Sequence, residues 1–164
     1  MDILEWLTGT ETGKWFFTLL VSMVPVIELR GAIPFGHNVL GLGIWPTLSA
    51  AVIGNLLPVP FIIVYIRRIF QWMRRHMPRF GRVVDALEEK AHLKGRKVSK
   101  YKYLGLAIFV GVPLPGTGAW TGSLAAAFLD MPLRRAIPSV VAGVVTAGVL
   151  ISVLSFGVGA LFAL

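Results

Sequence analysis

Residues 25–36 read Pro-Val-Ile-Glu-Leu-Arg-Gly-Ala-Ile-Pro-Phe-Gly, which places a carboxylate and a guanidinium in an otherwise apolar stretch. Uncharged sequence flanks this stretch on both sides, at 15–27 and at 44–66. Ionisable groups are costly within a membrane, so they usually face a cavity or pair with one another. The prolines and glycines of the stretch interrupt a helix. We therefore expect a charged, non-helical break inside a membrane protein.

Composition supports a membrane location. The mean hydropathy is +0.75, and long uncharged runs cover 44–66, 103–129 and 136–164. Each run exceeds the roughly 20 apolar residues that a spanning helix needs. The length fits a single membrane domain, 1–164. The chain has no cysteine, which excludes disulfides and cysteine-bound zinc, and its histidines show no metal-binding spacing. We expect no cofactor and no metal.

A basic segment divides the chain into two halves. All but two of the sixteen Lys and Arg residues lie between positions 67 and 135. Basic loops beside membrane spans are expected on the cytoplasmic side, so we predict a cytoplasmic connection at 67–102 and no nucleic-acid partner. The first half, 15–66, then consists of an apolar run, a break, a short return and a long span. The second half, 103–164, repeats this order.

The arginines at 134–135 constrain the topology. If every apolar run crossed the membrane, these arginines would lie outside, against the positive-inside rule. If 15–43 and 103–131 are re-entrant hairpins, the arginines lie inside and both termini lie outside. We therefore predict an all-α integral membrane protein. Its fold is an inverted repeat, in which each half contains a re-entrant helical hairpin and a transmembrane helix. This fold would bring the two breaks together at the midplane.

The first break offers two interpretations of its charged pair. In an extended segment, Glu28 and Arg30 share one face. Arg30 would then hold an anionic group, because a guanidinium matches phosphate and carboxylate geometry, and Glu28 would couple a proton or bind a cation. Alternatively, the two side chains form a structural ion pair that neutralises itself. Gly31 and Pro34 belong to the same candidate site.

The second break, Pro113-Leu-Pro-Gly-Thr-Gly-Ala-Trp-Thr-Gly122, carries no charge. A helix that starts near Thr117 or Thr121 would direct its N-terminal amides at the cavity and favour an anion. The alternative is close helix packing through the glycines at 118 and 122. Asn55, which lies within the span 44–66, is either a packing amide or a donor to the cavity. The candidate residues from these segments are Asn55, Pro115, Gly116, Thr117, Gly118 and Thr121.

With these two motifs, 25–34 and 113–122, the sequence resembles the family of small multidrug export proteins over nearly its whole length. That family is distantly similar to the DedA/VTT membrane proteins, which have paired re-entrant hairpins and a break with an acidic residue and an arginine. The resemblance implies movement of lipids or polyprenyl-phosphate carriers across a bilayer. This sequence has Glu28 and Arg30 in its first break and no acidic residue in its second.

We therefore expect a small transporter or lipid flippase in a prokaryotic-type plasma membrane, with membrane lipids and an anionic lipid or small molecule as partners. The alternatives are a small-molecule exporter, as the family label says, and a non-transporting membrane scaffold. The sequence contains no hydrolase constellation, so we expect no enzyme activity. With so few helices, a homodimer is a plausible assembly.

Overall fold

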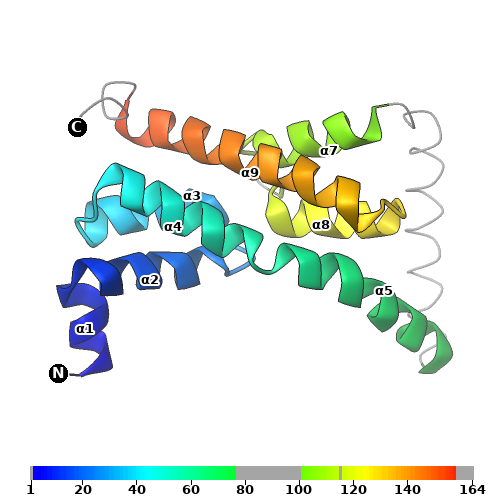
Figure 1. Ribbon diagram of the computed structural model, residues 1–164, viewed down its shortest axis with the longest axis horizontal. Coiled ribbons are helices and arrows are strands. Elements are labelled where there is room, and N and C mark those ends of the chain that lie inside the picture. The colour runs from blue at the N-terminus through cyan, green and yellow to red at the C-terminus, as the bar shows by residue number, and fades with distance from the viewer. Residues whose placement is uncertain (1, 77–100, 115, 158–164) are drawn as a thin grey trace.

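The computed structural model describes residues 2–76, 101–114 and 116–157, and every regular element in these ranges is helical (Figure 1). The first half contains α1 (Ile3–Gly9), α2 (Glu11–Ser22), α3 (Glu28–Pro34), the π-helix η1 (Phe35–Val39), α4 (Ile44–Leu56) and α5 (Val59–His76). The second half contains α7 (Lys102–Gly111), α8 (Ala119–Phe128) and α9 (Leu133–Phe156). The prediction of an all-α protein is confirmed for these described residues.

Within the described ranges, two helices are long and apolar enough to cross a membrane. One is α4 followed by the first part of α5, Ile44–Ile66, with a mean hydropathy of 2.0, and the other is α9, with a mean hydropathy of 2.3. They agree with the predicted spans at 44–66 and 136–164, although α9 already begins at Leu133. Past its apolar part, α5 continues to His76. Most of the predicted basic connection, 77–100, lies outside the described residues.

The chain follows a similar path in each half, starting from opposite ends of the molecule (Figure 1). α2 runs inward from the end that holds the N-terminus, and α3 and η1 return to that end; α7 runs inward from the other end, and α8 returns there. α2 packs on α4 and α7 packs on α9, while α3 also contacts α9 and α8 also contacts α5. How deeply the hairpins enter a membrane, and from which side, is defined only relative to a membrane. The re-entrant hairpins and the inverted repeat therefore stay predictions.

The interior is built largely from small residues, and many large apolar side chains face outward. Six alanines of the described part of the chain are completely buried: Ala32, Ala50, Ala51, Ala119, Ala126 and Ala136. By contrast, Val26 is 92% exposed and Leu154 is 76% exposed. Helices in membranes associate through small residues that allow close approach, and large exposed apolar surfaces suit contact with lipid. The distribution therefore fits the two candidate spans.

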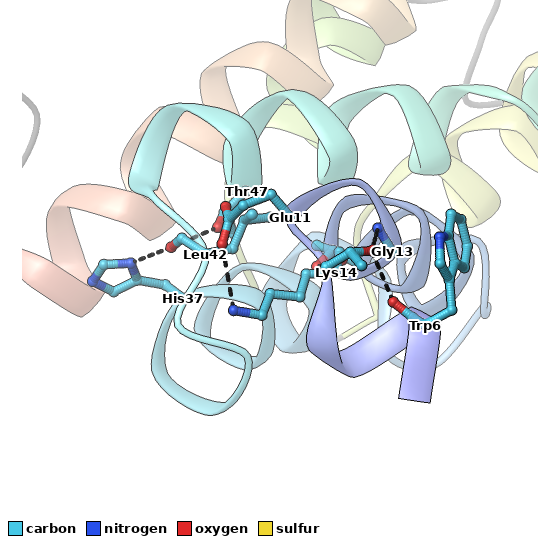
Figure 2. A network of polar contacts seen from close by, with 9 residues as sticks. Trp6, Glu11, Gly13, Lys14, His37, Leu42 and Thr47 are labelled. Atoms are coloured by element: carbon cyan, nitrogen blue, oxygen red, sulfur yellow. Dashed lines mark hydrogen bonds and ion pairs between the residues drawn. The ribbon is translucent and has the colours of Figure 1, made fainter. Parts of the chain in front are cut away.

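Polar contacts hold the end of the molecule where the first hairpin closes (Figure 2). The carbonyl oxygen of Leu42 accepts hydrogen bonds from Thr47 Oγ1 at 3.3 Å and from His37 Nδ1 at 2.8 Å. The His37 ring also meets the Phe156 ring edge-on, with 4.5 Å between centroids. These contacts join η1, α4 and the end of α9, and so they fix the direction in which α3 returns.

The predicted extended backbone of the first break is wrong. Only the segment between α2 and α3 is a turn, and α3 is helical from Glu28. Pro34 lies at the far end of α3, where its missing N–H removes the hydrogen bond to the carbonyl of Arg30 and leaves the earlier residues helical. The chain then widens into the π-helix η1 directly after this proline.

Candidate functional site

Hydrogen bonds join the two breaks of the chain. The backbone N–H of Trp120, in the first turn of α8, donates to Glu28 Oε1 at 3.2 Å. The guanidinium of Arg30 donates through Nη2 to the backbone carbonyl and to the hydroxyl of Thr117, the latter at 3.0 Å. Each charged residue of the first break therefore binds the second break.

Glu28 caps α8 from the other half of the protein. Gly118, the N-cap residue of α8, makes no side-chain cap because it has no side chain. The first N–H groups of a helix need acceptors, and a carboxylate is favoured there by the helix dipole. Glu28 is 7% exposed and supplies this acceptor. Its φ of 46° is in the left-handed region, which is uncommon for a residue other than glycine and occurs where a site constrains the backbone.

Gly118 is required by both conformation and space. Its φ of 151° and ψ of −170° lie in a region that is essentially restricted to glycine. A Cβ at this position would overlap the carboxylate of Glu28. A Cβ at Gly122 would instead meet the side chain of Val110, between α8 and α7. The two predicted interpretations of these glycines therefore apply to different residues, because Gly118 lies at the site and Gly122 serves helix packing.

Thr117 shapes the second break around Arg30. Its hydroxyl oxygen lies 2.7 Å from the carbonyl oxygen of Val112 and 2.8 Å from that of Leu114, which folds the break onto itself. Arg30 is half-buried, and its hydrogen bonds to the described residues all come from one of its three nitrogens, Nη2. A guanidinium has five N–H donors, so donors remain for a ligand.

Glu28 and Arg30 do not form the self-neutralising ion pair that was the structural alternative. Although both residues are described, no carboxylate oxygen of Glu28 lies within 4.0 Å of a nitrogen of Arg30. The two side chains bind different groups of the second break instead. Each charge is thus held by groups that a ligand could replace.

Asn55 brings an unsatisfied polar group to the same place. It lies on α4, is 1% exposed, and its Oδ1 has no hydrogen-bond partner among the described residues. A buried polar atom without a partner costs about 1–3 kcal/mol, so such an atom in a native fold calls for an explanation. The packing role considered for this amide does not provide a partner for Oδ1.

All three polar side chains line one cavity of about 230 Å³ of empty space, including open space at its mouth. Thr117 and Gly118 line it as well. The rest of the wall is apolar and comes from both halves: Leu29, Val110, Pro113, Ala119, Val144, Ala147 and Ile151. The cavity thus combines a carboxylate, a guanidinium and an amide with a mostly apolar lining.

Other predicted site residues lie outside this lining. A Cβ at Gly31 would meet the side chain of Ile27, and Pro34 ends α3. Gly116 is exposed with a φ of 82°, so it serves the turn. Thr121 donates to the carbonyl of Gly118 at 3.3 Å, within the first turn of α8. Pro115 lies outside the described residues.

Sequence reasoning did not include Trp120 in the site. Its backbone N–H binds Glu28, and its indole Nε1–H donates to the carbonyl of Met23 at 3.1 Å, at the end of α2. Trp120 therefore holds both sides of the turn before α3. An aromatic residue with a polar N–H inside an apolar break was the available signal, because a buried indole N–H usually finds a partner.

Comparison with known proteins gives one family. The family model described as "Putative small multi-drug export protein" matches residues 28–150, well over half of the chain. No curated protein matches the chain. No solved structure matches it either. The matched range begins at Glu28 and includes all described residues that line the cavity except Ile151. The chain therefore belongs to this family.

Proposed function

We propose that this member of the small multi-drug export family is a membrane transporter that moves a lipid with an anionic headgroup, at the cavity between its two breaks. One observation carries the proposal: the half-buried guanidinium of Arg30, the buried carboxylate of Glu28 and the buried amide of Asn55, whose Oδ1 has no partner among the described residues, line one cavity with mostly apolar walls. Ionisable residues at membrane depth are expensive and mark transport paths. A cavity at the junction of broken helices is the usual place for a transport site.

The hydrogen-bond donors of the site suit an anion. Arg30 offers N–H donors in a planar array that matches phosphate, and α8 directs its first N–H groups at the same cavity. The distant similarity that we infer between this family and the DedA/VTT proteins, which are implicated in moving lipid phosphates, is a second argument for this substrate class. A phosphate-bearing lipid headgroup is therefore the substrate class that we propose.

In this conformation the enclosed space of the cavity is only about 10 Å³, room for roughly one water molecule, so a ligand can enter only if the lining moves. The group that enters should therefore be small. A lipid needs to bury only its headgroup, because its acyl chains can remain in the bilayer. The exposed apolar side chains of α5 and α7, Phe61 and Ile108, offer such chains an outer surface.

The arrangement of the two halves suits alternating access in a plasma membrane. Their hairpins start from opposite ends of the molecule and meet at the site (Figure 1). In transporters built from inverted repeats, movement of one repeat against the other exposes a central site to each side in turn. We place the basic segment 67–102 and Arg134 on the cytoplasmic side.

Lipid movement in vesicles tests the proposal. The full chain is reconstituted into phosphatidylcholine vesicles with a trace of phosphatidylglycerol that is fluorescent at its headgroup, and dithionite is added outside. Without transport, dithionite bleaches only the outer leaflet. We expect bleaching of the inner leaflet as well, and its loss in Arg30→Gln. Arg134→Gln is the matched control, because Arg134 is exposed and outside the cavity.

The description of the family favours one alternative, the export of a small drug-like molecule. The same vesicles loaded with ethidium measure it. Efflux of ethidium without lipid movement would replace the lipid assignment by drug export. A chain that moves neither probe in well-sealed vesicles would favour the scaffold.

A further inference from the structure

The anion site at the start of α8 already holds an anion, and that anion belongs to the protein. The carboxylate of Glu28 accepts from the Trp120 N–H and touches Gly118, the position where a substrate phosphate would lie. Arg30 reaches the same cavity from the same helix. A bound phosphate would therefore need the place that the Glu28 carboxylate occupies.

A second observation points to a ligand that is absent from this arrangement. Asn55, on a different helix, lines the cavity, and its Oδ1 has no hydrogen-bond partner among the described residues although the residue is 1% exposed. The Glu28 carboxylate satisfies the start of α8 and leaves this amide unsatisfied. A ligand with a hydrogen-bond donor could satisfy this oxygen directly, whereas an acceptor-only anion could bind Asn55 only through its N–H groups, after rotation of the amide.

The charges around the cavity indicate that an anionic ligand must bring a compensating positive charge with it. Among the described lining residues, only Glu28 and Arg30 carry charge, and together they are neutral. The elements packed around α3 add none, because Glu11 and Lys14 on α2 pair with each other, His37 binds Leu42, and Arg134 and Arg135 are exposed. An anion entering alone would leave one uncompensated negative charge in an apolar cavity, which is strongly unfavourable.

We propose, building on the function above, that Glu28 is an internal substitute for the substrate anion, and that a lipid phosphate binds by displacing it as Glu28 takes up a proton. The proton adds to a carboxylate oxygen and forms a neutral carboxyl group, which releases the Trp120 N–H. A phosphate oxygen then accepts from this N–H and from Arg30. The cavity is neutral before the exchange and after it, so one proton moves with each monoanionic headgroup.

Calorimetric titration of the full chain in detergent with dimethyl phosphate tests this exchange. This phosphodiester remains a monoanion over the whole accessible pH range, so any pH dependence belongs to the protein. We expect binding that tightens as pH falls. We also expect proton uptake of about one per anion, measured from the dependence of the heat on the ionisation enthalpy of the buffer. Inorganic phosphate and phosphatidylglycerol vesicles serve as further probes. Tighter binding of dimethyl phosphate than of inorganic phosphate identifies a lipid headgroup, and the reverse identifies a free phosphate.

Glu28→Gln removes the competing charge and retains an oxygen that can accept from Trp120. It should bind dimethyl phosphate about tenfold more tightly at neutral pH, a factor equivalent to about 1.4 kcal/mol, with no proton uptake. Glu11→Gln changes a carboxylate outside the cavity and should behave as the wild type. Unchanged affinity in a folded Glu28→Gln protein would overturn the proposal. Binding by the wild type without proton uptake would overturn it too, even if the variant does not fold.

The outcomes separate this inference from the transporter assignment. Lipid movement by the wild type with proton-independent binding would leave a transporter in which Glu28 is only a cap. Coupled uptake of anion and proton by a chain that moves no lipid would leave the exchange site and remove the transport function.

Discussion

Replacing Gly118 by alanine should disrupt the contact between the two breaks. A side chain at this position has two separate penalties. The backbone, at φ 151° and ψ −170°, is restricted essentially to glycine, and a non-glycine residue in such a region costs about 1–3 kcal/mol. In addition, the new Cβ would displace the Glu28 carboxylate from α8. Loss of that charged hydrogen bond costs about 1.5–3 kcal/mol. We expect Gly118→Ala to lower the free energy of unfolding by about 2.5–6 kcal/mol.

Two other glycines separate these penalties. Gly116 also has a positive φ, 82°, but a Cβ there would meet nothing within 4 Å. Gly116→Ala should therefore show only the conformational penalty of about 1–3 kcal/mol. Gly105 lies inside α7 with open space and no positive φ. Gly105→Ala should be neutral or should stabilise the protein by about 0.4–1 kcal/mol.

Unfolding of the three variants in mixed micelles, followed by circular dichroism, measures these differences. The predicted order of stability is Gly105→Ala, then Gly116→Ala, then Gly118→Ala. The dimethyl phosphate titration supplies a second measurement, in which only Gly118→Ala should lose pH-dependent binding. Equal losses at 116 and 118, with binding intact in both, would refute the contact between Gly118 and Glu28.

Three further predictions concern the surroundings of the site. Asn55→Leu removes the unpartnered Oδ1, so it should raise the free energy of unfolding by up to about 1 kcal/mol yet weaken dimethyl phosphate binding; a fall in stability with unchanged binding would assign Asn55 to packing. Trp120→Phe keeps the backbone N–H and removes the indole donor to Met23, so it should cost about 0.5–1.5 kcal/mol in unfolding experiments without changing the pH dependence of binding. Single cysteines at Thr8 and Arg134 should be labelled only from outside and only from inside, respectively; outside labelling at Arg134 would contradict the hairpin topology.

The spans and the order of elements could be predicted because they depend on properties that sum along the chain. Long uncharged runs identified α4 with the start of α5, and α9. With the segment 67–102 inside, the arginines at 134–135 required an even number of crossings between that segment and α9, which made the hairpin interpretation the consistent one. The bounds shifted by a few residues, as with Leu133, because charge marks where a span begins less sharply than backbone geometry does.

The detail of the site was less predictable because it depends on individual backbone angles. Glu28 and Arg30 were expected to share a face through extended backbone, yet they line one cavity from a short helix that begins with a left-handed residue. No propensity predicts that angle for glutamate. The hydrogen bond from the backbone N–H of Trp120 to Glu28 could not be predicted either. Every residue except proline has a backbone N–H, and this one binds Glu28 only because it lies at the start of α8.

The sequence also could not distinguish glycines that belong to the site from glycines that serve packing. Gly31 and Gly118 are both glycines in a break, but one lies against Ile27 and the other against Glu28. A local pattern cannot tell which neighbour a missing Cβ would meet, because that neighbour comes from elsewhere in the chain. The sequence could therefore predict that the two breaks meet, but not which residues of one break contact which residues of the other.

Anomalous diffraction can test directly whether an anion binds between the two breaks. Dimethylarsinate is a tetrahedral anion at alkaline pH and presents two oxygens as dimethyl phosphate does, although its methyl groups are bonded directly to arsenic. The arsenic is located by its anomalous signal. In crystals of Glu28→Gln soaked at alkaline pH, we predict an arsenic peak in the cavity beside Arg30 and the Trp120 N–H, stronger than in wild-type crystals treated alike. An empty cavity in both proteins, with arsenic only at surface arginines such as Arg134, would contradict the account.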